Sequence, residues 1–415
     1  MCSSDLNRYQ TRLSAYEREL PIEYGSARVH VGDLVELDIE GVAHGGHFVA
    51  RLDGRVIFVR HAIQGEKVKA RITSLTSTFA RADCVEVIKA APDRVTAPCS
   101  YAHADGCGGC DFQHISLAAQ RRFKANVIKE QFSRIAKMNI DVEVEEVLPT
   151  SHWRSRMEFV VSPGRRLAMH QHRSHTLIEI ERCHIADERI DISKINAIKL
   201  PPGARVDVAA SSEKISTVIE SRENFDLVEE KVNGRSYQLN PLTFWQSHKE
   251  APSLLARTVR EMVQLRPGDK VADLYGGVGL FTGELLTELG SEGRIILIDS
   301  DTNAMTDARR NFANESRVTV IESKVETALL RNRNELERTN VVVLDPPRSG
   351  AGTKVLDEVI DIQPRVIVYV ACDPASLARD SRHLLDKGFQ ISLRAFDLFP
   401  MTHHIECVAR FIRES

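Results

Sequence analysis

From residue 241 to the end of the chain, short apolar runs typical of strands alternate with segments of helical character. A strand followed by a helix and then by another strand normally builds a parallel sheet, because the crossover returns the chain to the same edge. The pattern therefore predicts an α/β domain with a mostly parallel sheet covered by helices. The predicted strands are 270–274, 294–298, 318–321, 340–344 and 365–371.

Two further zones precede this domain, as the length of 415 residues leads us to expect. Residues 26–90 contain five short β-rich runs with glycine corners, which predict a small barrel of the oligonucleotide-binding type. The runs are 29–31, 34–39, 55–59, 67–72 and 82–87. Residues 91–240 form a predicted central domain with a cysteine cluster, a helix-like stretch at 117–138 and two β-rich regions.

Residues 1–25 are an N-terminal extension in which Leu6, Tyr9 and Leu13 lie at helical spacing. We interpret it as a short amphipathic helix that serves as a packing appendage. No apolar run approaches the roughly 18 residues that a membrane span needs, and the start of the chain lacks the apolar core of a signal peptide. We therefore expect a cytoplasmic protein without a membrane partner.

The formal net charge of −3 argues against a protein that coats nucleic acid without specificity. A local basic face is still possible. The segment 151–175 carries a single acid, Glu158, against four histidines and five arginines, which are Arg154, Arg156, Arg165, Arg166 and Arg173. We interpret this segment as a candidate phosphate-binding face, with a solvated strand pair as the alternative.

A glycine-rich turn, 276–279, follows the strand 270–274, and the next strand ends at the acid Asp299. Ligands of such sheets bind where strand ends meet helix starts, and a carboxylate there can accept hydrogen bonds from ribose hydroxyls. These features leave a dinucleotide and S-adenosylmethionine both open. The fourth strand decides between them, because it ends in Asp345-Pro346-Pro347, and an acid followed by two prolines is frequent in base methyltransferases.

Cys372 follows the fifth strand and lies at the same predicted sheet edge. Carbon 5 of uracil is too weak a nucleophile to attack a methylsulfonium unaided, but a thiolate that adds to carbon 6 turns the ring into an enolate. The carbon 5 proton must then be removed by a base. Glu406 precedes the last apolar strand and can reach Cys372 if that strand joins the edge of the sheet. Taken alone, each residue would be read as ordinary packing or an exposed acid.

The central zone holds a C-x7-C-G-G-C array of Cys99, Cys107 and Cys110, and Cys183 is the remaining cysteine there. Four thiolates suit zinc or an iron–sulfur cluster, and the spacing does not choose between them. Cys2, Cys84 and Cys407 are interpreted as unligated.

The chain resembles the bacterial RNA 5-methyluridine methyltransferases, in the branch with an N-terminal TRAM domain and a [4Fe-4S] cluster. The resemblance rests on GVAHGG at 41–46, GEKV at 65–68, CGGC at 107–110, QH at 113–114, FWQ at 244–246, DLY at 273–275, DPPRSGA at 345–351, YVACDPA at 369–375 and HIE at 404–406. It implies a class I (Rossmann-like) methyltransferase domain over 241–415, a TRAM barrel over 26–90 and an iron–sulfur-bearing α+β domain over 91–240.

The resemblance also implies roles for individual residues. These are adenosylmethionine contacts at Gln246, Tyr275, Asp299 and Asp345, the nucleophile Cys372, the base Glu406, and the cluster ligands Cys99, Cys107, Cys110 and Cys183. Four positions depart from the family, which usually has cysteine at Gly276, asparagine at Leu280, glutamate at Asp299 and asparagine at Asp373. The last departure puts a carboxylate beside Cys372, which disfavours the thiolate unless Asp373 points away or meets a cation.

The sequence thus predicts a monomeric enzyme that methylates carbon 5 of one uridine in structured RNA, with ribosomal RNA favoured over transfer RNA. Cytosine methylation shares the chemistry but normally takes its nucleophile beside a proline after the fourth strand, where this chain has no cysteine. An RNA-binding or folding factor that has lost catalysis is the alternative of another class, motivated by the departures at Leu280, Asp299 and Asp373.

Overall fold

The computed structural model describes residues 29–219 and 226–413, so the helix predicted within residues 1–25 lies outside them. The chain divides into two compact units. The first contains the described residues up to 41 together with 47–91, and the second contains 42–46 and the described residues from 92 onward. Among the described residues, no helix is long and apolar enough to cross a membrane.

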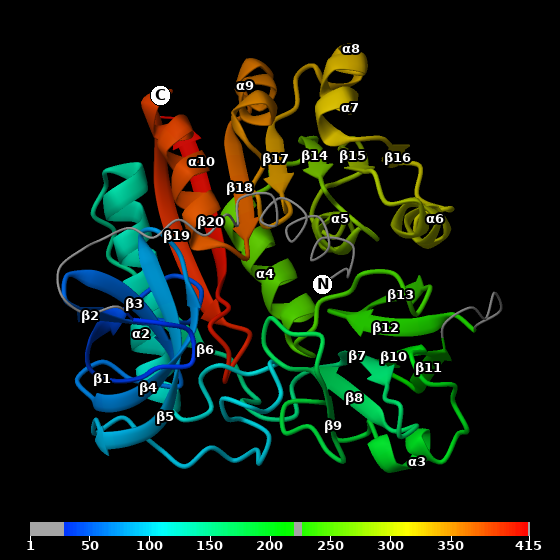
Figure 1. The fold of residues 1–415 in the computed structure, drawn as a ribbon. Coiled ribbons are helices and arrows are strands. Elements are labelled where there is room, and N and C mark those ends of the chain that lie inside the picture. Colours follow the sequence, from blue (N-terminus) through cyan, green and yellow to red (C-terminus); the bar gives the residue numbers. More distant parts are fainter. Residues whose placement is uncertain (1–28, 220–225, 414–415) are drawn as a thin grey trace. The chain divides into compact units, whose positions relative to one another are not determined.

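The first unit is a closed five-stranded barrel with the order β1-β2-β3-β5-β4 (Figure 1). Its strands are β1 (Leu34–Val42), β2 (Phe48–Leu52), β3 (Arg55–Arg60), β4 (Lys67–Leu75) and β5 (Phe79–Lys89). Alternate residues face the interior, as Val68, Ala70 and Ile72 of β4 do. The buried carboxylate of Glu66 accepts hydrogen bonds from the backbone of Ile63 and Ala91, which ties the end of the barrel to the loop before β4.

The prediction of a five-stranded barrel is confirmed, but one of its strands was wrong. Residues 29–31 form no strand, because the chain turns at Val31 and Gly32, and Gly32 has a φ of +97°. The fifth strand is β2, in which Phe48 and Ala50 are fully buried. Gly45 and Gly46 precede it, and in the sequence they indicate a turn rather than the start of a strand.

The second unit begins with α2 (Leu117–Gln131), which ends in a π-helical turn, η1 (Phe132–Ala136). A five-stranded antiparallel sheet follows, with the order β11-β10-β7-β8-β9. Its strands are β7 (Arg156–Val161), β8 (Leu167–His170), β9 (Leu177–Glu179), β10 (Arg205–Ala210) and β11 (Ile215–Ile219), and α3 (Ile192–Asn196) packs beside them. A hairpin of β12 (Val228–Val232) and β13 (Arg235–Leu239) leads to α4 (Ala251–Val263).

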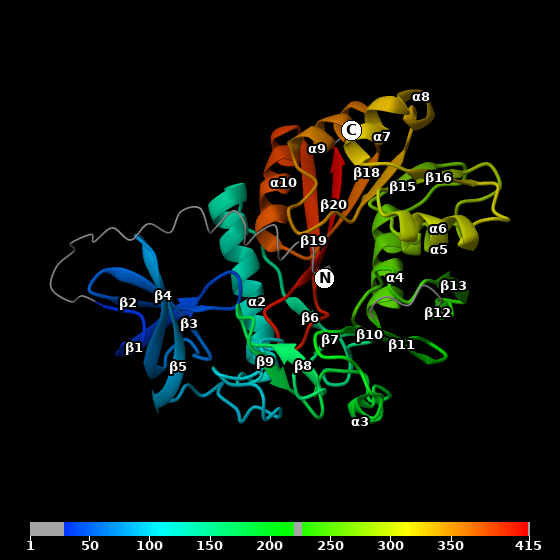
Figure 2. The same ribbon diagram turned by 45° about the vertical axis from the view of Figure 1, so that its right-hand side comes forward.

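An eight-stranded sheet with the order β16-β15-β14-β17-β18-β20-β19-β6 forms the rest of this unit (Figures 1 and 2). The strands β14 (Lys270–Leu274), β15 (Arg294–Asp299), β16 (Val318–Glu322), β17 (Val341–Leu344) and β18 (Val366–Ala371) are parallel, as the alternating pattern predicted. The last two strands of the chain, β19 (Phe389–Asp397) and β20 (Glu406–Arg413), form an antiparallel hairpin, and β20 pairs with β18.

Helices cover both faces of the large sheet. One face packs against α2, α7 (Val325–Arg331), α9 (Thr353–Asp361) and α10 (Pro374–Asp386), and the other against α4, α5 (Leu280–Leu285) and α6 (Thr302–Asn311). A short helix, α8 (Arg333–Leu336), follows α7. Every residue of β17 and β18 is buried, which explains why these strands appear as unbroken apolar runs rather than as alternating ones.

Two contacts beside β19 join the central region to this sheet. The short strand β6 (Val144–Glu146) adds to β19 as a parallel edge strand. Beside it, Lys124 of α2 donates a hydrogen bond of 2.6 Å to Asp397 at the end of β19, and both side chains are only 1% exposed. Burial lowers the pKa of Lys124, and the carboxylate of Asp397 opposes that shift.

We expect loss of this buried ion pair to destabilise the second unit strongly, because removing one partner leaves an unpaired buried charge. Asp397→Leu alone should lower the free energy of unfolding by about 3–5 kcal/mol, whereas Lys124→Met combined with Asp397→Leu restores most of that loss. Urea unfolding followed by tryptophan fluorescence measures it, since both tryptophans, Trp153 and Trp245, lie in this unit. Equal destabilisation in the single and double variants would contradict the role assigned to the pair.

Candidate active site

The carboxyl end of β14 leads into a turn with an unusual backbone. Tyr275, Gly277 and Gly279 all have positive φ, at 62°, 53° and 89°. At Gly279 a side chain would also collide with its surroundings, because a Cβ there would lie 2.3 Å from the ring of Phe312. The glycine is therefore required for conformation and for space, and it lets the chain turn tightly from the strand into α5.

Two acids hold this turn in place. The buried Asp273, the next-to-last residue of β14, accepts hydrogen bonds from the backbone N–H (3.1 Å) and the hydroxyl (2.7 Å) of Thr282 on α5. Asp299 ends the neighbouring strand β15, and its Oδ2 accepts a hydrogen bond of 3.0 Å from the N–H of Gly277. Its Oδ1 accepts a second backbone hydrogen bond of 2.9 Å, from the N–H of Asp301, so Asp299 lies beside the glycine turn with both oxygens bound to the protein's own backbone.

Asp345 directly follows β17, the neighbour of β14 on its other side, and its N–H bonds to the carbonyl of Leu274. The strand order reverses at β14, and ligands of open α/β sheets bind at such a switch point. Tyr275, Asp299 and Asp345 thus lie at the ends of three adjacent strands. Their common position fits the predicted cofactor site.

Cys372 and Glu406 come together through strand register. Ala371, the last residue of β18, pairs with Cys407 of β20 in an antiparallel ladder, so the residues one step further, Cys372 and Glu406, lie opposite each other. Glu406 is 4% exposed. The sequence suggested that the last strand would join the edge of the sheet, whereas β20 lies between β18 and β19, inside it.

The acids and the thiol of this site disfavour each other's ionisation. Burial, followed by Glu406 and Asp345, raises the pKa of Cys372 to about 12. Burial and the neighbouring Asp345 raise the pKa of Glu406 well above its ordinary value. Burial, with Asp273 and Asp299, raises the pKa of Asp345 to about 7. A bound cation would relieve this crowding of negative charge.

Asp373, the departure beside the nucleophile, has two partners of its own. Its Oδ1 accepts a hydrogen bond of 2.8 Å from the N–H of Ser376 and caps the start of α10. Its Oδ2 lies 2.9 Å from Nε2 of His44, in the segment 42–46 that groups with the second unit. This hydrogen bond with Asp373 raises the pKa of His44. Asp373 thus has a hydrogen-bond partner of its own in His44, and it raises the pKa of Cys372 less than burial, Glu406 and Asp345 do.

Sequence reasoning gave no role to two residues of this site, Arg348 and His404. The positive charge of Arg348 lowers the pKa of both Cys372 and Glu406. Its Nη2 lies 3.2 Å from Nδ1 of His404, whose pKa burial holds well below the ordinary value. Both residues stand within motifs on which the family resemblance rests, so those motifs could have pointed to them. No chemical role had been assigned to either residue.

Gln246 lies in the loop before α4. Asp307 of α6 holds this loop in place. The carboxylate of Asp307 accepts hydrogen bonds from the N–H of Asn240 and from the hydroxyl of Thr243. Trp245 is buried beside Tyr237, with ring centroids 5.7 Å apart. The side chain of Gln246 is partly buried, and its contact with a cofactor stays a prediction.

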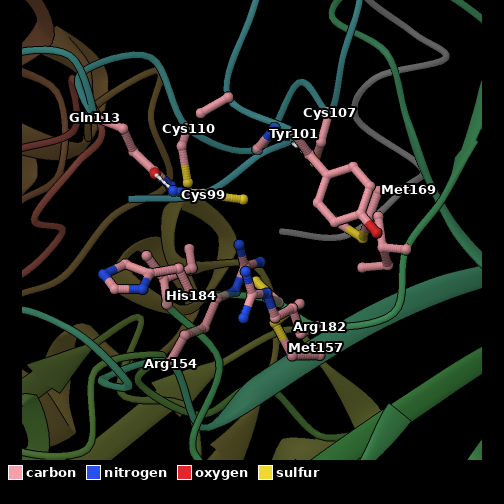
Figure 3. Close-up of a pocket in the computed structure, with 15 residues that line it drawn as sticks. Cys99, Tyr101, Cys107, Cys110, Gln113, Arg154, Met157, Met169, Arg182 and His184 are labelled. Carbon is pink, nitrogen blue, oxygen red and sulfur yellow. Dashed lines mark hydrogen bonds between the residues drawn. The ribbon is translucent and has the colours of Figure 1, made fainter. Parts of the chain in front are cut away.

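The four cysteines of the central zone surround one pocket. Figure 3 shows this pocket with Cys99, Cys107 and Cys110 on one side and Arg154, Arg182 and His184 on the other, and Cys183 also lines it. Burial raises the pKa of Cys107 to about 11 and also raises those of Cys110 and Cys183. Arg154 opposes the shift at Cys107 and Cys183. In residues 29–219 and 226–413, no three His, Cys, Asp or Glu side chains are grouped as ligands of a single metal ion.

The segment 151–175 is not a free basic face along its whole length. Arg156 pairs with the buried Glu230, and Arg154 lines the cysteine pocket and donates to the carbonyl of Arg156. Arg166 pairs with Glu181 at 3.2 Å. Acids from outside the segment therefore neutralise part of its charge, which a count within the segment does not reveal.

Proteins of similar sequence match over most of this chain. An uncharacterized RNA methyltransferase of Streptomyces avermitilis is 38% identical, over 91% of this chain and 98% of its own. Another, from Streptomyces coelicolor, is 37% identical over 91% of this chain and 93% of its own.

The chain belongs to this family of RNA methyltransferases. Three family models match this methyltransferase, described as TRAM domain (residues 28–85), tRNA (Uracil-5-)-methyltransferase (307–414) and Protein-L-isoaspartate(D-aspartate) O-methyltransferase (204–327). Among solved structures, the tRNA (uracil-54, C5)-methyltransferase of Pyrococcus abyssi with S-adenosyl-L-homocysteine has a TM-score of 0.70 at 19% identity, over 91% of this chain and all of that one. That likeness confirms the α/β methyltransferase fold.

The raised pKa of Cys372 predicts how the free methyltransferase reacts with iodoacetamide, which attacks the thiolate. With a pKa of about 12, the alkylation rate should rise about tenfold per pH unit from about pH 7 to about pH 9, where an ordinary thiol begins to level off. Mass spectrometry of the peptide that contains Cys372 gives the rate, and glutathione serves as the reference thiol. A plateau below about pH 8 would show that the free protein already stabilises the thiolate.

Proposed function

We propose that this methyltransferase transfers a methyl group from S-adenosylmethionine to carbon 5 of one uridine in structured RNA, with ribosomal RNA as the favoured substrate. The observation that carries the proposal is the pairing of Ala371 with Cys407, which sets Cys372 opposite Glu406 beside Asp345. A thiol and a carboxyl at one site are the two groups that methylation of a uracil ring requires. The TRAM family model matches residues 28–85, which include most of the barrel.

The methyl donor would bind at the carboxyl ends of β14, β15 and β17. In this proposal Asp299 accepts from the ribose hydroxyls with the lone pairs that Gly277 and Asp301 leave open, and Tyr275 and Gln246 pack against the donor. Asp345 faces its positive charge. A cationic ligand there would favour the ionised form of Asp345, whose pKa is raised by burial and by two further acids.

The reaction then proceeds in three steps. Cys372 releases its thiol proton to solvent, its thiolate Sγ adds to carbon 6 of uracil, and the electrons of the 5,6 double bond move into the enolate. Carbon 5 attacks the methyl group of the sulfonium, whose C–S electrons stay on the departing S-adenosylhomocysteine. Glu406 takes the proton from carbon 5, and those electrons re-form the double bond and release the Cys372 thiolate.

Binding of the methyl donor would change the charge around the thiol of Cys372. In the free protein burial keeps Cys372 protonated, and Glu406 and Asp345 add to that effect. The positive sulfonium and the guanidinium of Arg348 act in the opposite direction. We infer that the methyl donor prepares Cys372 for attack as well as carrying the methyl group.

A transfer RNA uridine is the second candidate substrate. The family model that matches residues 307–414 and the similar Pyrococcus abyssi structure both carry transfer RNA in their descriptions. Ribosomal RNA is favoured here because the chain resembles the branch that combines the barrel with a cysteine cluster. The experiment below separates the two substrates.

We further propose that Cys99, Cys107, Cys110 and Cys183 hold a [4Fe-4S] cluster. Four thiols line one pocket, a ligand set that suits both zinc and an iron–sulfur cluster, and the resemblance to the branch with a TRAM domain favours the cluster. The guanidinium groups of Arg154 and Arg182 would offset the negative charge of the thiolates. The cluster would hold the central region together rather than carry electrons.

Transcripts of the source organism's ribosomal and transfer RNAs, made with 5-fluorouridine, test the proposed reaction. A fluorine at carbon 5 cannot leave as a proton does, so the enzyme and S-adenosylmethionine should form a denaturation-resistant adduct with one transcript. Cys372→Ala should abolish the adduct and lower methylation of the normal transcript more than about a thousandfold.

The matched control is Cys84→Ala, which removes a buried cysteine from the barrel and should leave the adduct intact. Full activity of Cys372→Ala would refute the mechanism. Absence of S-adenosylmethionine binding in calorimetry would favour a non-catalytic RNA-binding factor instead.

Anaerobic purification tests the cluster. We expect an absorbance band at about 400 nm with bound iron and sulfide, both lost in Cys110→Ser and both kept in Cys84→Ser. A colourless protein with one bound zinc would contradict the iron assignment.

A further inference from the structure

The turn between β19 and β20, residues 398–405, ends at the proposed base Glu406 and is tied to the cysteine-bearing part of the chain. Both backbone groups of Met401 are held. Its carbonyl accepts a hydrogen bond of 3.0 Å from the N–H of Phe112, and its N–H donates one of 2.7 Å to Oε1 of the buried Gln120. The other end of the Gln120 amide donates to the carbonyls of Phe112 and Ile115.

One side-chain pair strengthens this tie nearer to the base. Oδ2 of Asp111 lies 2.5 Å from Nδ1 of His403, and the two side chains are 12% and 26% exposed. Neither residue was predicted from the sequence to have a role. Asp111 follows Cys110 directly, whereas His403 lies three residues before Glu406, so the contact joins segments almost 300 residues apart.

The ring of His403 also contacts residues beside the reacting groups. Its centroid lies 4.1 Å from that of His404, which in turn lies within hydrogen-bonding distance of Arg348. Arg348 is the cation that favours the ionised forms of Glu406 and Cys372. A shift of His403 would therefore move the start of β20 and the surroundings of its first residue together.

We propose that Asp111 is a positioning residue for proton removal, acting through His403 to hold the turn that presents Glu406 to carbon 5 of the ring. The inference rests on the proposed function. It concerns only the last step, in which the carbon 5 proton moves to Glu406, its electrons re-form the 5,6 double bond, and the bond from carbon 6 to the Sγ of Cys372 breaks.

A base that is slightly out of place slows this step and leaves the earlier ones intact. The enzyme then accumulates as a covalent adduct with methylated RNA, because the thiol can leave only after the proton has gone. A 5-fluorouridine transcript has no such proton, so formation of its adduct reports on thiol attack and methyl transfer alone. Comparing the two transcripts therefore isolates the proposed effect.

The experiment compares Asp111→Asn with the wild-type enzyme on both transcripts. We expect adduct formation with the 5-fluorouridine transcript to stay within about twofold of wild type, while turnover of the uridine transcript falls about 10–100-fold, the cost of a small misplacement of a catalytic group. The uridine adduct, resolved on a denaturing gel, should rise in the same proportion.

Two further variants sharpen the test. Asp141→Asn makes the same change at a 99% exposed aspartate that pairs with Lys129, and it should behave as wild type. The double variant of Asp111→Asn with His403→Gln should be no slower than the slower single variant, because both changes break one contact. Bound iron, measured in each preparation, should be unchanged in Asp111→Asn.

The outcomes are distinct. Unchanged turnover in Asp111→Asn, equal slowing of both transcripts, or slowing accompanied by loss of iron would each overturn the positioning role. Failure of the wild-type enzyme to form any 5-fluorouridine adduct would instead refute the proposed function.

Discussion

The insertion of β20 between β18 and β19 is the contact on which the site depends. Antiparallel pairing fixes which residues face each other, so the match of Ala371 with Cys407 puts Cys372 and Glu406 at the same end of the sheet. A slip of one residue would turn Glu406 to the other face. The buried ladder around them makes such a slip costly, since β18 is buried at every position.

The same burial creates the electrostatic character of the site. Asp273, Asp345 and Glu406 all have raised pKa values, with burial as the leading cause, and each acid adds to the shift of a neighbour. Burial thus disfavours the ionised forms of these acids and of the nearby thiol, and a bound cation would favour them. In the proposed function, binding of the cationic methyl donor would therefore favour the thiolate of Cys372.

Much of this arrangement could be predicted from local patterns. The five parallel strands, the barrel, and the acids and thiol at strand ends follow from hydrophobic runs and from the rule that ligands bind at carboxyl edges. Where a prediction failed, the pattern was short or its partners were distant. The glycines at 45 and 46 hid β2, and Glu230 neutralises Arg156 from 74 residues away.

The sequence by itself determined the class of fold, the strand-end positions of Tyr275, Asp299, Asp345 and Cys372, and the supply of a carboxylate at Glu406. Only the tertiary structure decided that β20 lies inside the sheet, that Asp373 caps α10 and meets His44, and that Asp111 contacts His403. The physical reason is that hydrophobic periodicity reports on which face of an element is buried. It carries no information about which distant side chains share a hydrogen bond once those faces have packed.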